Sequence, residues 1–216
     1  MSAAWAAIDL PARPCEFTYC AIPLDDLPPI EAPHDGSLAW LPMPTHRLEW
    51  AVGSSDPDRE FDDSALERLI QVCAVDGLTL PESMVRFLGS DRRNWIRSAT
   101  GCWLDLSERV VTVPDTDISI VRFLNDQQGS LHWYLALNRA GERGVIASGH
   151  RLDSDDDRDI HPDEPFVCAG SFEEFLYRYW LENEIYFRTS EGAELTPDQA
   201  AYLAQLENRE SQRESE

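Results

Sequence analysis

The seven residues 131–137, Leu-His-Trp-Tyr-Leu-Ala-Leu, constrain the fold more than any other stretch of the chain. Leu131, Trp133, Leu135 and Leu137 alternate with the residues between them, which is the period of two expected when a β-strand buries one face. A sheet face that carries tryptophan and leucine must be covered by another layer of structure. The surrounding sequence therefore has to supply both neighbouring strands and a cover.

Two further apolar runs flank this stretch. Ile118–Leu124 precedes it and Gly144–Ser148 follows it, and the polar residues 125–129 and 139–142 separate the three runs. Short runs joined by such turns are typical of an antiparallel meander. We therefore predict a single-domain α+β fold. Its central sheet is expected to be mostly antiparallel, with the meander around residues 118–150, and to be covered by helices.

The strongest helix signal begins at Ser171. Ser171 and Glu174 form a capping box, in which each side chain satisfies a free backbone amide at the start of the helix. The apolar residues that follow lie on one helical stripe: Phe172, Phe175, Leu176, Tyr179 and Trp180. We expect this stripe to pack on the meander.

Weaker patterns complete the set of elements. A second capping box at Ser64 and Glu67 predicts a helix that ends at Gly77, and Pro81 predicts the start of a shorter helix that ends at Gly89. Further predictions are short strands at Cys102–Leu106 and Val110–Val113, an edge strand at Arg47–Val52, and a last helix that starts at Thr196.

We divide the chain into three parts. Residues 1–60 contain nine of the 14 prolines, a density that prevents long helices and weakens central strands. We expect them to form an irregular N-terminal extension that wraps the domain. Residues 61–190 form the α+β domain. Residues 191–216 form a C-terminal helix and an acidic tail, which we expect to be disordered from Glu207 onward because it has no apolar residue.

The charge of the chain restricts its partners. Forty acidic and 18 basic residues give a formal charge of −22, and every basic residue is an arginine. Sites that depend on lysine, such as a Walker phosphate loop or a Schiff base, cannot be built here. A strongly negative field repels nucleic acid and anionic membranes and favours basic proteins, although it also simply keeps a protein in solution. We expect a protein partner, with neither nucleic acid nor membrane.

Cysteine usage and hydropathy bear on the compartment. The five cysteines are odd in number, scattered and without a CxxC pair. The first residues lack the basic region of a secretory signal, and no stretch approaches the roughly 18–20 apolar residues that span a bilayer. We therefore expect a cytoplasmic protein.

The sequence contains no familiar catalytic or cofactor motif. HExxH, GxSxG and glycine-rich phosphate loops are all missing, so we predict neither an enzyme nor a cofactor. His132, in the middle of the central strand, is more simply explained as a strand residue than as a base. An enzyme or ligand-binding role in a cleft beside the meander stays open as a third alternative.

Residues 153–164, the acidic segment, are the strongest candidate for a binding site. A dense row of carboxylates can imitate phosphates and attract the basic active site of a nuclease. The spacing also resembles a calcium loop, but Arg158 replaces the glycine that such a loop needs for its turn. A docking surface, a solvated loop and a calcium site remain open, and we predict no metal. The candidate partner-binding residues are Asp153, Asp155, Asp156, Asp157, Asp159, Asp163 and Glu164.

Three pieces of the sequence resemble a known family. Gly77–Pro81 runs towards Phe87, Arg122–Leu137 forms the aromatic meander, and Phe166–Leu176 contains a Ser-Phe pair followed by a Phe-Leu pair. In this order they resemble the SUKH superfamily, which includes Syd-like proteins and fungal cell-wall-assembly regulators. That family typically shows a "G..LP......F" helix start, a central sheet, and a closing helix entered through "SF..FL". The resemblance covers roughly residues 64–187.

The resemblance implies a non-enzymatic protein-binding role. Many bacterial members of the family are similar to immunity proteins, which neutralise polymorphic toxins, often nucleases, inside the producing cell. We therefore expect an immunity protein that blocks a basic toxin domain through the acidic segment. The alternative is a SUKH-like regulatory or scaffold protein with a non-toxin partner. The family shares no catalytic motif, so the resemblance assigns no catalytic residue.

Overall fold

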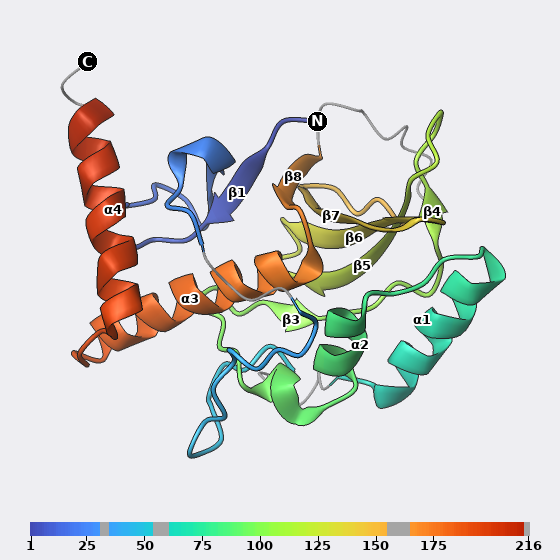
Figure 1. Ribbon diagram of the computed structural model, residues 1–216, viewed down its shortest axis with the longest axis horizontal. Coiled ribbons are helices and arrows are strands. Elements are labelled where there is room, and N and C mark those ends of the chain that lie inside the picture. Colours follow the sequence, from blue (N-terminus) through green and yellow to red (C-terminus); the bar gives the residue numbers. More distant parts are fainter. Residues whose placement is uncertain (31–34, 54–60, 155–164, 214–216) are drawn as a thin grey trace.

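A computed structural model of the chain describes residues 1–30, 35–53, 61–154 and 165–213, with side chains as far as residue 209 (Figure 1). These residues form a six-stranded antiparallel sheet, a separate two-stranded hairpin and four α-helices. The predicted α+β single domain is confirmed. None of the described helices is long and apolar enough to cross a membrane.

The large sheet has the strand order β3-β5-β6-β7-β8, and the short strand β4 pairs with β5 beside β3. Its centre is the predicted meander, because β5, β6 and β7 follow one another in the chain and pair in that order. The short strands predicted near residues 102–106 and 110–113 are present as β3 and β4. The strands are β3 (Trp103–Leu104), β4 (Val111–Thr112), β5 (Ser119–Asn125), β6 (His132–Asn138), β7 (Gly141–Ser148) and β8 (Phe166–Ala169).

Strand β7 begins earlier than the sequence indicates. Asn138 pairs with Gly141 across a two-residue turn, so Gly141 and Glu142, predicted as turn, already belong to the strand. Gly144 lies in β7 at φ +119°, and a Cβ atom built there would stand 2.5 Å from the carbonyl oxygen of Ala169 in β8. Only glycine permits this backbone conformation and this close approach.

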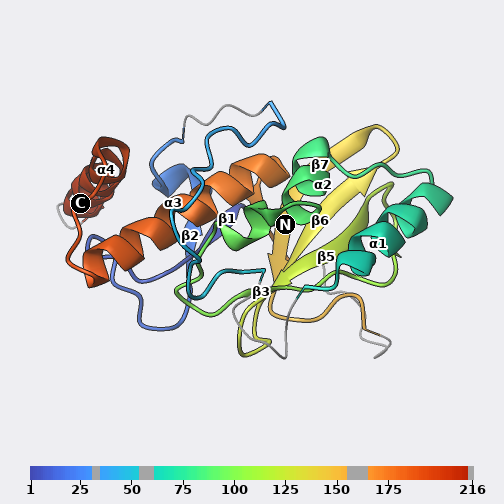
Figure 2. The same cartoon turned by 90° about the horizontal axis from the view of Figure 1, so that it is seen from below.

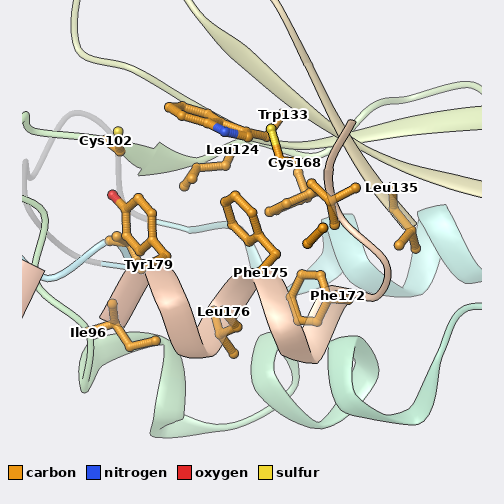
Figure 3. Close-up of a cluster of buried hydrophobic side chains, with 14 of the residues drawn as sticks. Ile96, Cys102, Leu124, Trp133, Leu135, Cys168, Phe172, Phe175, Leu176 and Tyr179 are labelled. Atoms are coloured by element: carbon orange, nitrogen blue, oxygen red, sulfur yellow. The ribbon is translucent and has the colours of Figure 1, made fainter. Parts of the chain in front are cut away.

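One face of the sheet carries the hydrophobic core. The aromatic stripe of α3 (Phe172–Ser190) packs on it: Phe175 lies 6.3 Å from Trp133 between ring centroids, and Phe172 lies 5.2 Å from Phe123 (Figure 3). Phe172, Phe175 and Trp133 are each at most 1% exposed. Helices α1 and α2 lie on the same side of the sheet as α3 (Figures 1 and 2). The predicted packing on the meander is confirmed for Phe172 and Phe175, whereas Trp180 packs on Trp40 instead.

The helices begin close to their predicted positions, with two corrections. Ser171 caps α3 as expected, and its hydroxyl accepts a hydrogen bond from the amide of Glu174 at 3.1 Å. The first helix, α1 (Asp63–Val75), is capped instead by Asp62, whose carboxylate accepts from the amide of Ser64 at 2.9 Å. Helix α2 (Glu82–Leu88) has Pro81 as its N-cap rather than as its first helical residue.

The last helix, α4 (Pro197–Arg213), is longer than predicted. Residues 207–213, expected to be disordered, continue the helix. Tyr202 and Leu206 are 4% exposed and anchor α4 in the core, and Arg209 donates a hydrogen bond to the carbonyl oxygen of Asp25 at 2.6 Å. Tertiary contacts therefore stabilise a segment whose own composition is too polar to order it.

The N-terminal region contains a hairpin that the proline count did not predict. Strands β1 (Ala4–Ala7) and β2 (Cys20–Pro23) pair with each other, and β1 is completely buried. The amide of Val167 in β8 donates to the carbonyl oxygen of Ser2 at 2.8 Å, which places the hairpin beside the large sheet. The predicted edge strand at Arg47–Val52 is wrong: Ala51 makes only an isolated bridge, and Trp50 has a left-handed φ of 61°.

A buried carboxylate joins the N-terminal region to α3 and α4. Glu182, on α3, is 1% exposed and accepts hydrogen bonds from the indole of Trp5 at 2.9 Å, the guanidinium of Arg13 at 2.7 Å and the hydroxyl of Tyr202 at 2.7 Å. Each donor comes from a different segment of the chain. Trp5 and Arg13 are thus part of the core of the domain.

The cysteines are only partly as expected. Cys15, in the connection between β1 and β2, forms a disulfide with Cys20 at the start of β2, although disulfides are rare in the cytoplasm expected for this chain. Cys73, Cys102 and Cys168 are free and buried, where a thiol acts as a small apolar side chain.

Candidate partner-binding site

The acidic segment begins at a buried ion pair on the second face of the sheet, opposite the core. Arg122, in β5, is 1% exposed, and its Nε atom donates to the two carboxylate oxygens of Asp153 at 3.1 and 3.2 Å. The same guanidinium forms an ion pair with Asp105. Arg122 is a charged residue inside an apolar strand, and such residues are buried only when they are paired.

Two more arginines converge on Asp153. Arg109 donates from Nε and Nη2 to the carbonyl oxygen of Asp153, at 3.2 and 2.9 Å. Arg151 donates to the carboxylate at 3.3 Å. Both the backbone and the side chain of Asp153 are therefore held, so the first residue of the acidic segment is fixed.

The charges in this cluster reinforce one another. Burial alone would raise the pKa of Asp153, but the hydrogen bonds and positive charge of Arg122 outweigh it and hold the pKa below its ordinary value. Burial alone would lower the pKa of Arg122, but the hydrogen bonds that it donates to Asp153 and the negative charge of Asp105 raise it instead. Both groups are charged at neutral pH.

Neutral polar groups complete the cluster. His132 in β6 is 7% exposed, and its Nδ1 lies 2.7 Å from the side-chain oxygen of Asn125. Burial, followed by the charge of Arg122, lowers the pKa of His132, so its ring is neutral at pH 7. The hydroxyl of Tyr134 accepts a hydrogen bond from the amide of Leu152 at 2.8 Å. The bond to Tyr134 ties Leu152, the residue before Asp153, to the sheet.

The structure describes one of the seven predicted binding residues. Asp153 is 9% exposed and its carboxylate is occupied by arginines, so it anchors the acidic segment and does not present its charge to solvent. Its predicted contact with a partner stays a prediction. The remaining six lie outside the described residues: Asp155, Asp156, Asp157, Asp159, Asp163 and Glu164.

Asp153 is not available as the first ligand of the calcium loop that the sequence resembles. Asp153 would occupy position 1 of the loop, where a carboxylate has to face the ion, and two arginines hold it instead. Among the described residues, no group of three or more histidine, cysteine, aspartate or glutamate side chains is arranged to hold a metal ion.

Sequence reasoning missed the arginines of this cluster. Arg122 interrupts the apolar run Ile118–Leu124, which is a usable signal, because a charge within a buried strand requires a buried partner. The partners themselves carry no local pattern, since Asp105 and Asp153 lie 17 and 31 residues from Arg122 in the chain.

No protein-family model, curated protein or solved structure matches the chain.

Proposed function

We propose that the protein is a non-enzymatic binding protein whose partner is a basic protein domain, and that the acidic segment supplies much of the attraction. The observation that carries the proposal is the anchor at Asp153. Three arginines fix the start of a stretch in which six further carboxylates lie between residues 155 and 164. A chain of charge −22 attracts basic partners from a distance and repels acidic ones.

An immunity role is the most specific form of this proposal. It is supported by the resemblance of residues 64–187 to the SUKH superfamily and by the acidic charge, which suits a basic, nuclease-type toxin. The proposed place of action is the cytoplasm. Three buried free thiols agree with a reducing compartment, whereas the Cys15–Cys20 disulfide counts against one, because disulfides are rare there.

The test is capture of the partner from cells that naturally make the protein, with the tagged full chain as bait. The comparison bait carries Asp155, Asp156, Asp157 and Asp159 as asparagine. A charge-matched control neutralises four exposed carboxylates elsewhere, by amide substitution of Glu16, Glu49, Glu67 and Asp76.

We expect a basic protein to bind the natural chain at about 0.05 M salt and to be released at about 0.5 M, where the Debye length is only a few ångströms. The acidic-segment variant should lose this protein and the control should keep it. Equal retention by both variants would remove the acidic segment from the proposal. A salt-insensitive complex with a non-toxin protein would support the regulatory or scaffold role instead.

A further inference from the structure

The five cysteines differ sharply in their access to solvent. Cys15 and Cys20, which form the disulfide, are both half-buried. Cys73, Cys102 and Cys168 are free and at most 1% exposed. A small thiol in solution can therefore reach the disulfide of the folded chain but not the three free cysteines.

Burial also makes the three free thiols poor nucleophiles. It raises the pKa of Cys73 to about 11, and it raises the pKa of Cys102 and the pKa of Cys168 as well. Thiol–disulfide exchange requires a thiolate, whereas these three side chains are neutral thiols at pH 7. They therefore do not compete with a thiol from solution for the disulfide.

The disulfide closes a short loop whose tip has few other restraints. Glu16, Phe17 and Thr18, at this tip, are exposed, and within the described part of the chain they make no backbone hydrogen bond. The side chain of Phe17 is 77% exposed. The bond between Cys15 and Cys20 is thus the main restraint on the loop tip.

The chain on both sides of the loop is tied to the domain by contacts of its own. Before the loop, Arg13 donates to the buried carboxylate of Glu182 at 2.7 Å. After the tip, the hydroxyl of Tyr19 lies 2.8 Å from that of Thr100, and its ring lies 5.6 Å from the ring of Trp133. Strand β2 then pairs with the buried strand β1. Opening the disulfide should therefore free the loop tip and leave the hairpin and the core folded.

The loop contributes to an uncharged pocket. Residues 17–21 line a pocket of about 310 Å³ together with Leu131, beside β6, and Phe166 in β8. None of the residues that line it is charged, although the chain as a whole carries a charge of −22. The position of the loop tip therefore sets the shape of this part of the surface.

A disulfide that a small thiol can reach is suited to regulation. Disulfides in the cytoplasm are usually transient or redox-sensing, and exposed disulfides are the more easily reduced ones. We propose that the Cys15–Cys20 disulfide is a reversible redox switch, which a small thiol such as glutathione opens in the folded protein, releasing residues 16–18. The inference uses the proposed place of action, the cytoplasm, but does not depend on the proposed partner.

Two molecules of glutathione are consumed each time the switch opens. The thiolate of the first attacks one sulfur of the disulfide, breaks the bond between Cys15 and Cys20 and forms a mixed disulfide with the protein. The second glutathione attacks the mixed disulfide and leaves as glutathione disulfide. The two cysteines take up the two protons that the glutathione thiols lose. The reverse reaction, with glutathione disulfide as the oxidant, closes the switch.

The first measurement is the redox state of each cysteine in the folded full chain. The protein is equilibrated with mixtures of reduced and oxidised glutathione up to about 10 mM, and iodoacetamide then traps the free thiols for mass spectrometry. We expect Cys15 and Cys20 to become labelled together as reduced glutathione rises. They should be protected again in a sample that is returned to oxidised glutathione before trapping. The three buried cysteines should react at least about tenfold more slowly.

The second measurement is chymotrypsin cleavage of the trapped chain after glutathione is removed. Cleavage after Phe17 requires the loop tip to open into the protease, which the closed loop resists. We expect this cleavage to be about tenfold faster in the reduced chain than in the oxidised chain. Cleavage after Trp50, which lies outside the loop and is 51% exposed, should change by less than about twofold and is the internal control.

The double variant Cys15→Ser with Cys20→Ser lacks the bond without carrying a label. It should be cleaved after Phe17 as fast as the reduced chain, should not respond to glutathione, and should have the circular dichroism spectrum of the natural chain. Because its loop is open without a reductant, it separates the effect of the bond from the effects of glutathione and iodoacetamide.

Several results would overturn the switch. A disulfide that about 10 mM reduced glutathione leaves intact is a permanent cross-link. Labelling of all five cysteines together, or a double variant that does not fold, would make the bond necessary for the fold as a whole. Equal cleavage after Phe17 in both redox states would show that the bond does not restrain the loop tip. Cysteines 15 and 20 that stay labelled in oxidised glutathione do not form the bond. Each of these results leaves the proposed binding function intact, because the capture experiment tests that function separately.

Discussion

Replacing Arg122 by methionine tests the anchor of the acidic segment. Methionine fills a similar volume but removes the cation that holds Asp153 and Asp105. Breaking a buried ion pair from one side costs about 3–5 kcal/mol, because a carboxylate is left without its partner. Here we expect the lower end, about 3 kcal/mol, since Asp153 keeps its contact with Arg151 and the side chain of Asp105 is 27% exposed to water.

Urea unfolding followed by tryptophan fluorescence measures this loss, which corresponds to a decrease in Tm of about 6–12 °C. The matched control is Arg86→Met, which breaks an exposed ion pair with Glu82 and should cost less than about 1 kcal/mol. The double variant Arg122→Met with Asp153→Asn should recover about 1–2 kcal/mol, because the unpaired carboxylate is gone. If the two substitutions simply add, the ion pair does not couple these residues and the anchor is refuted.

The same pair predicts the behaviour of the protein in acid. The pKa of Asp153 is lower in the folded chain than its ordinary value of about 4. Its ion pair therefore stabilises the fold above that pH, and the contribution is lost as the pH falls through the folded pKa. We expect the free-energy difference between the natural chain and Arg122→Met to shrink below about pH 4 in urea titrations. A difference that stays constant down to pH 2 would contradict the ion pair.

Three local features give further predictions. Ser171→Ala removes the cap of α3 and should cost about 1 kcal/mol of unfolding free energy, whereas Ser171→Asp should preserve it; equal losses would contradict the cap. Trp50→Gly should be about 1 kcal/mol more stable than Trp50→Ala in thermal unfolding, because only glycine relieves the left-handed φ, and identical Tm values would argue against strain. Gly144→Ala should cost about 2 kcal/mol or more through the contact with Ala169, and a variant as stable as the natural chain would show that β7 and β8 can separate there.

Much of the fold could be predicted because its signals are local. Alternation in residues 131–137 identified the central strand, and the helical stripe after Ser171 identified the helix that covers it. The N-terminal hairpin was not predicted. Proline density reports only the average strand propensity of the region, whereas β1 is stabilised by burial beside β8. The last turns of α4 were not predicted for the same reason: their composition is polar, but the burial of Tyr202 and Leu206 in the core stabilises the helix.

The amino-acid sequence by itself determined the period of each strand and helix, the caps of α3 and the excess of negative charge, since each of these properties depends on neighbouring residues or on composition. Only the tertiary structure decided which charged side chains form ion pairs inside the protein. Arg122 meets Asp153 across 31 residues of chain, and Arg13 meets Glu182 across 169. Such pairs form because a buried charged group loses its hydration and needs an oppositely charged partner. Only the fold brings residues so far apart in the sequence into contact.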